Sequence, residues 1–580
     1  MHRATDPSLL LPCLIVLGHL PAQDATAALP VAGAPDVVFS ATHDLVIVHV
    51  NTPGHPTNVV PGTGTPFRTG GTGTSAFERP WTSSDGSHLA INVVAGAPAT
   101  TTDDDVLLLD GALLLREGSA APWTATENVG TIDADFAINN SGHLLFGNNT
   151  SATTLDDYIV QWNGASWSVL AQEGGATPLG GTWSSSIDSL ALSNPGGAYW
   201  RDAAIVGLPA TSSAAVVLGG GGFLQEGVDI PLGQAGGATN TWENFTINRI
   251  YVSPNGASYL VLGDTNAATT GDLVLVLNNT VQIQEGQVLP GSTFATGVSA
   301  IGKAWIDRGG NWYARGSNAT TGDDWLVRNG VLVADSAGAS EVVPGSGEFW
   351  DDASFTTCFF CADGNALGQF VFGGVTTAPL VSNGVLVFDD GAGFRRVVAR
   401  ESDPIDLDGN GLFDDDRFFN TFGDDDVLLL DDGSIVFTAT LKNGAGTAVD
   451  QGLFKLVPKA GSCTLRNGTG VNPLACTCAS LPILGTTWNV AVAPSPNTAL
   501  TLAFASAAPT PFPVPLFGGE LLIDPLTAIS LPGSLVHPVP LPPSQQFLGL
   551  LFFVQGIRIE VVGPALVIQL VNGQDAVIGL

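Results

Sequence analysis

The chain contains the stretch Gln225-Glu226-Gly227-Val228-Asp229-Ile230-Pro231, and this Glu-Gly-x-x-x-Pro phrase recurs along the sequence. The other copies are Glu117-Gly118 before Pro122, Glu173-Gly174 before Pro178, Glu285-Gly286 before Pro290, and a degenerate Arg400-Glu401-Ser402-Asp403-Pro404. The glutamates are 56, 53, 59 and 116 residues apart, and 116 is two units of 58. We therefore expect a further degenerate copy of the repeat at Val333-Ala334-Asp335-Ser336. A regular period of this size indicates a repeat architecture.

Two tight-turn phrases keep the same period. The first is Asp85-Gly86, Ser141-Gly142, Pro195-Gly196, Asn255-Gly256, Gly309-Gly310, Asp363-Gly364 and Asp432-Gly433. The second is Asp110-Gly111, Asn163-Gly164, Gly220-Gly221, Asn278-Asn279, Asn329-Gly330 and Asn383-Gly384. Because such pairs supply the positive φ angles of two-residue hairpin turns, each unit is predicted to hold two hairpins, or four strands.

Repeated four-stranded units predict an all-β fold, with a β-propeller of seven blades over residues 36–457. A β-solenoid is the alternative. The last unit, from about Phe418 to Val457, has strand signals for only three strands, and a strand at Asp44–Val50 precedes the first unit. We expect this N-terminal strand to complete the last blade, which would close the ring and remove open sheet edges.

The Glu-Gly-x-x-x-Pro repeats with their Asp/Asn-Gly turns resemble a family of secreted bacterial, planctomycete-type propeller-like repeat proteins. The resemblance covers residues 36–457. It implies a propeller and export, and it supplies no activity.

The composition changes after Lys459, where the repeat phrases stop and proline becomes dense. Strand-like runs continue at Trp488–Val492, Ala499–Phe504, Phe547–Val554 and Arg558–Val562. Residues 461–580 are therefore predicted to form a C-terminal β-sandwich. This part resembles a module that recurs on secreted planctomycete proteins. Substrate docking or surface association is one role for it, and a stabilising or export-related cap is the other.

Residues 1–27 are predicted to be a signal peptide, because an apolar run from Leu9 to Leu20 is followed by small residues. The protein is expected to be secreted, or located at the cell surface or in the periplasm. No later run is apolar enough for a membrane span. The 19 Lys and Arg residues are scattered, and the net charge is −34, so nucleic acid is not an expected partner.

Six cysteines are present, and Cys13 leaves with the signal peptide. In an exported protein, Cys463 is expected to bridge to Cys476 or Cys478. Cys358 and Cys361 are expected to form a structural bridge. Because residues three apart on a straight strand point to opposite faces, that bridge needs a bulge or turn. Free thiols or a redox or metal role are the alternatives for this pair.

One acidic stretch between the sixth and seventh units resembles an EF-hand loop. Its candidate calcium ligands are Asp406, Asp408, Asn410, Leu412 through its carbonyl, Asp414 and Asp416. Closely spaced oxygen ligands with a glycine at position 6 suit Ca²⁺. Arg417 occupies position 12, where a bidentate glutamate is usual. The loop is predicted to be a structural calcium clamp, with a solvated acidic loop as the alternative.

Other carboxylates recur once per unit. They are the glutamates of the main repeat and the aspartates of a Thr-Thr-x-Asp phrase at Thr101–Asp105, Thr154–Asp157, Thr269–Asp272 and Thr320–Asp324. Repetition at equivalent positions favours turn-capping and structural roles over catalysis. An acidic ring that collects cations is the alternative. No catalytic residue is assigned, because no known catalytic motif occurs.

The leading functional hypothesis is an exported, non-enzymatic binding or surface-associated propeller, with an extracellular protein or a carbohydrate as ligand. The alternatives are a calcium-dependent propeller hydrolase (lactonase-like or phosphatase-like) and a polysaccharide-cleaving propeller with two facing carboxylates. Unrepeated polar residues converging in the channel would favour catalysis. Nine tryptophans are candidates for a carbohydrate face, although most are expected in the core: Trp162, Trp167, Trp183, Trp200, Trp242, Trp305, Trp312, Trp325 and Trp350.

Overall fold

The computed structural model describes residues 59–68, 77–96, 99–132, 135–292, 294–318, 323–337, 340–351, 357–391, 395–405, 415–456, 461–542, 547 and 550–579. Within these ranges the chain is all-β, and it includes a short 3₁₀ turn, Ala235–Gly237. No helix in this part of the chain is long and apolar enough to cross a membrane. The predicted signal peptide, residues 1–27, and the predicted closing strand, Asp44–Val50, lie outside the described residues.

Residues 77–284 form four antiparallel sheets of four strands each. The first sheet is β1 (Phe77–Thr82), β2 (Leu89–Val94), β3 (Asp105–Leu109) and β4 (Ala112–Arg116). The second is β5 (Phe136–Ile138), β6 (Leu144–Asn149), β7 (Asp157–Trp162) and β8 (Trp167–Gln172). The third is β9 (Ile187–Leu192), β10 (Ala198–Asp202), β11 (Ala215–Val217) and β12 (Phe223–Gln225). The fourth is β13 (Trp242–Val252), β14 (Tyr259–Thr265), β15 (Leu273–Leu277) and β16 (Thr280–Gln284).

Residues 298–456 add two more four-stranded sheets and one three-stranded sheet. The fifth sheet is β17 (Val298–Ile306), β18 (Trp312–Asn318), β19 (Asp324–Arg328) and β20 (Val331–Asp335). The sixth is β21 (Phe359–Gly364), β22 (Phe370–Val375), β23 (Gly384–Asp389) and β24 (Arg395–Arg400). The three-stranded sheet is β25 (Phe418–Leu429), β26 (Ile435–Lys442) and β27 (Ala448–Leu456).

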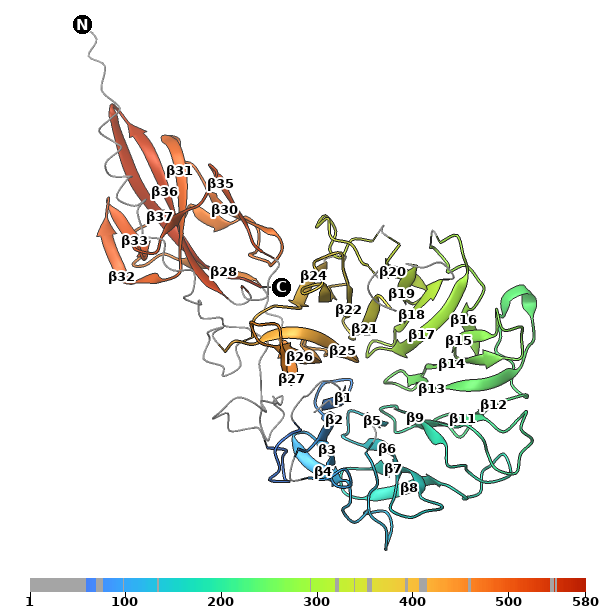
Figure 1. The fold of residues 1–580 in the computed structure, drawn as a ribbon. Helices are drawn as coiled ribbons and strands as arrows, with labels where there is room; N and C mark the ends of the chain where they lie inside the picture. Colours follow the sequence, from blue (N-terminus) through green and yellow to red (C-terminus); the bar gives the residue numbers. More distant parts are fainter. Residues whose placement is uncertain are drawn as a thin grey trace.

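These sheets follow one another around a common centre, with the first strand of each innermost, as Figure 1 shows. The chain thus has the predicted propeller-like all-β fold. The first and last sheets meet, because the Phe77 backbone N–H donates to Gln451 Oε1 on β27 at 3.3 Å. Phe77 and Val93 of the first sheet share one hydrophobic core with Leu428 and Val436 of the three-stranded sheet.

The core lies between neighbouring sheets. Central strands are buried on both faces, as in β15, where Val274, Leu275 and Val276 are fully buried. Stacking of sheets face to face around the centre explains why these strands read as continuous apolar runs and do not alternate. The largest side chains in these interfaces include Trp242, Trp325 and Trp350, each less than 2% exposed.

The Glu-Gly phrase joins each sheet to the next. Glu226 Oε2 accepts the Ala214 backbone N–H at 2.9 Å, at the start of the third strand of its own sheet. The Gly227 N–H donates to the Trp242 carbonyl at the start of the next sheet, at 2.8 Å. An equivalent backbone bond, to the next sheet or to the segment that leads into it, recurs at the other copies, from Gly118 to Val129, Gly174 to Trp183, Gly286 to Val298 and Ser402 to Phe419. Glu226 therefore has a structural role, as do Glu173 and Glu401, whose carboxylates accept the Asp156 and Gly384 backbone N–H groups.

Most of the predicted turn pairs close hairpins. Gly86, Gly142, Gly196, Gly256, Gly310 and Gly433 all have positive φ in the first turn, and the pairs at 110–111, 278–279 and 329–330 have it in the second. Two pairs are placed differently. Asp363 and Gly364 belong to β21, whose turn uses Gly368 (φ 83°) instead. Gly384 is the first residue of β23 and does not form a hairpin turn. Its backbone N–H donates to Glu401 Oε2 at 3.1 Å.

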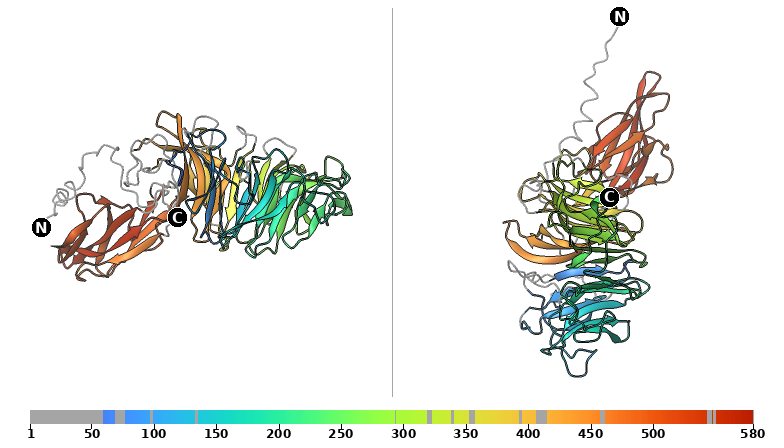
Figure 2. Two further views of the ribbon diagram at one scale, coloured as in Figure 1. Left: turned by 90° about the horizontal axis from the view of Figure 1, so that it is seen from below. Right: turned by 90° about the vertical axis from the view of Figure 1, so that its right-hand side faces the viewer.

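Residues 461–579 form a separate module beside the ring, seen edge-on in Figure 2. The five-stranded sheet has the order β28-β37-β36-β31-β34, and two smaller sheets have the orders β29-β30-β35 and β32-β33. Its strands are β28 (Ser462–Arg466), β29 (Cys476–Cys478), β30 (Thr487–Val492), β31 (Thr498–Ser506), β32 (Pro509–Leu516), β33 (Gly519–Ile523), β34 (Ile529–Ser530), β35 (Val536–Pro540), β36 (Leu551–Val562) and β37 (Ala565–Val577).

The smaller sheets pack on the large one, since β29 and β33 both contact β37. Trp488, Val554 and Val571 belong to a buried hydrophobic cluster that also includes Phe419 and Leu456 of the ring, so the core of the module is continuous with that of the last ring sheets.

Candidate functional site

A small cavity lies at the centre of the ring, and all the first strands contribute to its wall. It has a volume of about 100 Å³, and its lining includes Trp81, Ile138, Leu192, Tyr251, Asp363 and Leu428. Ligand pockets commonly have volumes of about 300–1,000 Å³. The channel cavity therefore has room for several water molecules and is too small for a sugar ring.

Arg308, which follows β17, spans this channel. Its Nη1 donates to Asp363 Oδ2 on β21 and to the Leu429 carbonyl on β25, both at 2.6 Å. Its Nη2 donates to Thr82 Oγ1 on β1. One guanidinium thus joins four sheets. Burial raises the pKa of Asp363 to about 6, while the charge of Arg308 opposes that rise.

A second group of charges lies further along the channel. Lys303 on β17 forms an ion pair with Asp425 on β25. Arg315 on β18 pairs with Asp424 at 2.9 Å and donates to the Phe359 carbonyl. Unrepeated charged residues, among them Lys303, Arg308 and Asp425, therefore do converge at the ring centre. They neutralise one another, however, so these carboxylates serve to join sheets.

An open polar groove lies at the outer connection between the first and second sheets. Its volume is about 720 Å³. The polar lining is Thr100, Thr102, Asp103, Arg116, Glu117, Ser119, Asn128 and Ser151. Arg116 Nη2 lies 3.0 Å from Asp103 Oδ2, and Thr100 Oγ1 donates to Asp103 Oδ1 at 2.8 Å. The groove is thus open to solvent, large enough to admit a ligand, and walled by hydrogen-bonding groups.

The two repeated acidic phrases meet beside this groove. Carboxylate oxygens of Asp104, Asp105 and Glu117 all lie within 4.8 Å of one another. The equivalent residues of the second sheet, Asp156, Asp157 and Glu173, form a second such group. The sequence places these residues in separate phrases, and only the hairpin pairing of the strands brings them together.

Like charges and burial act on both acidic groups. Burial, with Glu117 and Asp104 nearby, raises the pKa of Asp105 to about 7. Burial, with Asp156 and Glu173 nearby, raises the pKa of Asp157 to about 6. Asp103 has the predicted turn-capping role, because its Oδ1 accepts the Thr100 backbone N–H at 2.5 Å.

The nine candidate tryptophans do not form a carbohydrate face. Seven are at most 9% exposed, namely Trp183, Trp200, Trp242, Trp305, Trp312, Trp325 and Trp350. Trp162 and Trp167 are half-buried and pack on each other with ring centroids 5.5 Å apart. The expectation that most of these rings belong to the core is confirmed, because they fill the space between sheets.

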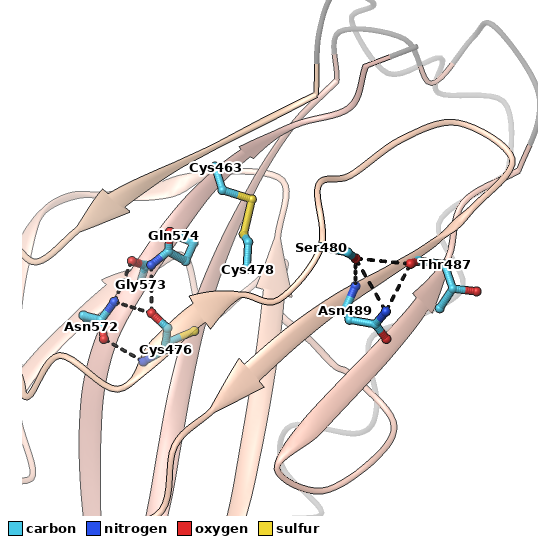
Figure 3. Close-up of a disulfide and its surroundings, with 9 residues drawn as sticks. All are labelled: Cys463, Cys476, Cys478, Ser480, Thr487, Asn489, Asn572, Gly573 and Gln574. Atoms are coloured by element: carbon cyan, nitrogen blue, oxygen red, sulfur yellow. Dashed lines mark hydrogen bonds between the residues drawn. A yellow bond between two sulfur atoms is a disulfide. The ribbon is translucent and has the colours of Figure 1, made fainter. Parts of the chain in front are cut away.

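Cys463 and Cys478 form a disulfide in the C-terminal module, with their Cα atoms 6.4 Å apart (Figure 3). It links β28 to β29, strands of two different sheets. Cys476, the other expected partner of Cys463, is a buried free thiol. The Cys476 backbone is held instead by Asn572, whose Oδ1 accepts the Cys476 N–H at 2.7 Å.

The expected bridge between Cys358 and Cys361 is wrong. Cys361 is a buried free thiol on β21, and Cys358 Sγ donates to the Val375 carbonyl at 3.5 Å. A register irregularity does occur between Phe359 and Cys361. It leaves the two sulfur atoms in separate environments, as extended backbone would.

The predicted calcium loop is only partly described. Asp406, Asp408, Asn410, Leu412 and Asp414 lie outside the described residues. Asp416 is exposed, and its Oδ1 accepts the Gly444 N–H at 2.7 Å. This oxygen therefore caps a turn between β26 and β27.

Comparison with known proteins supplies distant structural likenesses. No protein-family model and no curated protein matches the chain. A fucoside-bound mutant of the Aleuria aurantia lectin matches 56% of this chain and 95% of its own, at 10% identity and a TM-score of 0.27. The polysaccharide lyase Uly1 matches 68% of this chain and 93% of its own, at 10% identity and a TM-score of 0.33. Such low scores carry no argument about ligand or activity.

Proposed function

We propose that the chain is an exported, non-enzymatic binding protein, with a carbohydrate as its ligand. The observation that carries the proposal is the open groove of about 720 Å³ beside Arg116, with its wall of hydroxyl, amide, carboxylate and guanidinium groups. Neutral polyols are recognised through such mixed donors and acceptors. The net charge of −34 disfavours anionic ligands, which favours neutral sugars over acidic ones.

The enzymatic alternatives need reactive carboxylates at the ring centre. A calcium-dependent hydrolase or a polysaccharide-cleaving propeller would use acidic groups there that are available to metal or substrate. In the described part of the channel, Asp363 and Asp425 are each paired with a basic side chain. This pairing favours binding over catalysis.

A glycan array and calorimetric titration of the mature chain test the ligand class. We expect binding of a neutral oligosaccharide to weaken at least tenfold in Arg116→Ala, because that side chain lines the groove. Arg116 is a partly exposed ion-pair partner, so its loss should cost little stability. Arg558→Ala, on the C-terminal module, is the matched control and should bind normally. Equal binding by both variants would contradict the groove assignment.

The finer architecture is also part of the proposal. The six four-stranded sheets and the three-stranded sheet are proposed as seven blades spanning residues 36–457, with Asp44–Val50 as the fourth strand of the last blade. Residues 461–580 are proposed as a β-sandwich. Deletion of residues 36–50 should expose the edge of β27 and cause aggregation, measurable by light scattering. An equally soluble deletion variant of unchanged melting temperature would refute the closure.

Calcium at Asp406, Asp408, Asn410, Leu412, Asp414 and Asp416 is proposed as a structural clamp. Calorimetric melting with and without chelator should show a calcium-dependent shift that is smaller in Asp406→Ala/Asp408→Ala. A shift of unchanged size in that variant would refute the loop assignment. Export itself is tested by N-terminal sequencing of the mature protein, which should begin near residue 28.

A further inference from the structure

We propose that Asp104, Asp105 and Glu117 bind a hard divalent cation, with Ca²⁺ as the best-fitting ion. The site goes beyond the proposed carbohydrate binding and lies beneath the groove, with Glu117 common to both. It is distinct from the acidic loop at residues 406–416.

The hairpin of β3 and β4 assembles the three carboxylates. Asp105 opens β3 and Glu117 follows β4, and the Glu117 backbone N–H donates to the Asp105 carbonyl at 2.9 Å. One carboxylate oxygen from each residue lies within 4.8 Å of the others. Ca²⁺–oxygen distances of about 2.3–2.6 Å allow ligand oxygens to be up to about 5 Å apart across the ion. The spacing of the three oxygens is therefore compatible with coordination of one Ca²⁺ ion.

Glu117 gives an independent sign that a ligand is required. Its residue surface is only 7% exposed. Oε1 accepts a hydrogen bond from Thr131 Oγ1 at 3.3 Å, whereas no donor bonds buried Oε2, and the carboxyl group nearest to Glu117 is that of Asp104. A buried carboxylate oxygen without a donor is costly, and the nearest groups in this cluster are other carboxylates. A cation between them would satisfy Oε2 and remove the repulsion.

The charges around the cluster favour a divalent ion. Arg68 forms an ion pair with Asp104 and offsets one of the three negative charges. The remaining charge of −2 matches one divalent cation. Glu78 also acts on Asp105 and makes the local potential more negative. Oxygen-only ligands select Ca²⁺, Mg²⁺ or Mn²⁺ over softer metals.

The equivalent group on the second sheet supplies an internal control. Asp156, Asp157 and Glu173 are all only half-buried. Glu173 Oε2 accepts the Asp156 backbone N–H at 3.1 Å, so Glu173 has a donor for the oxygen whose counterpart in Glu117 has none. We expect this group to bind Ca²⁺ far more weakly than the first.

Calorimetric titration of the chelator-treated mature chain with CaCl₂, without sugar, tests the proposal. We expect Glu117→Gln to lose one equivalent of bound Ca²⁺, or to weaken that equivalent at least tenfold. Glu173→Gln should bind as the wild type does. A parallel titration with MgCl₂ should show weaker binding, because Mg²⁺ requires shorter, near-octahedral contacts of about 2.1 Å.

Equal stoichiometry and affinity in wild type and a folded Glu117→Gln variant would overturn the site, as would the absence of wild-type binding at millimolar Ca²⁺. Asp105→Asn provides a second variant if Glu117→Gln does not fold, with the same loss expected. Since no sugar is present, failure of carbohydrate binding leaves this result unaffected. Loss of the calcium site, in turn, is measured without reference to the glycan array.

Discussion

The Arg308 guanidinium and the Asp363 carboxylate form an ion pair inside the ring, with Nη1 and Oδ2 2.6 Å apart. Both side chains are at most 10% exposed. The same arginine also bonds the last sheet through the Leu429 carbonyl and the first sheet through Thr82. A single buried pair therefore holds together segments more than 200 residues apart in the chain, between residues 82 and 308.

Replacement of Arg308 by methionine should destabilise the ring strongly. Methionine fills similar space and leaves Asp363 buried without a cation, a change that typically costs about 3–5 kcal/mol. The free energy of unfolding from urea titration at pH 7 is the measurement. Arg558→Met, an arginine on the other module, should change it by less than about 0.5 kcal/mol. A loss below about 1 kcal/mol in Arg308→Met would show that the pair is not required for ring stability.

The stability of the protein should depend on pH through the ionisation of Asp363. Its folded pKa of about 6 lies above the value of about 3.9 for an unfolded aspartate, so the folded state binds the proton more tightly. The stabilisation of the folded state by proton binding to Asp363 is fully present below pH 4 and is lost as the pH rises through about 6. As the pH rises from 4 to 8, the free energy of unfolding of the wild type should therefore fall relative to that of Asp363→Asn. A difference that is constant with pH would contradict the raised pKa.

Gly227 should tolerate no side chain. Its φ is +66°, and an added Cβ would lie 2.1 Å from the Thr211 carbonyl oxygen. Gly227→Ala is expected to cost more than the about 1–2 kcal/mol of the left-handed backbone alone. Gly236 has the same kind of φ, +65°, with open space around it, so Gly236→Ala measures the backbone part separately. Equal melting shifts in the two variants would contradict the close approach to Thr211.

Removal of the Cys463–Cys478 disulfide should weaken the C-terminal module. The bridge spans 15 residues, and closing a loop of this length is worth about 3 kcal/mol in the chain-entropy model. Hydrogen exchange of the backbone amides of residues 461–579 in Cys463→Ser/Cys478→Ser and wild type is the measurement. Cys476→Ala is the control, since it removes a free thiol and leaves the bridge intact. Native Cys476 should resist alkylation because it is buried.

Much of the fold could be predicted because its signals are local. Asp110-Gly111 and Asn329-Gly330 set hairpin turns through their own φ angles. The prediction was wrong where a dipeptide typical of turns also fits a strand. Asp363-Gly364 is composed like a turn, but Asp363 is drawn into β21 by Arg308 and by the Leu429 N–H at 2.7 Å. The Cys358 and Cys361 spacing likewise carried no information about the strand geometry around it.

The amino-acid sequence by itself determined the repeated four-strand unit, because hairpin turns and the Glu-Gly link depend on residues close in the chain. Only the tertiary structure decided which charges meet. Lys303 and Asp425 are brought together by closure of the ring, and Asp104, Asp105 and Glu117 by the pairing of β3 with β4. Electrostatic partners depend on distance in space, and distances between separate strands are set by packing and not by spacing along the chain.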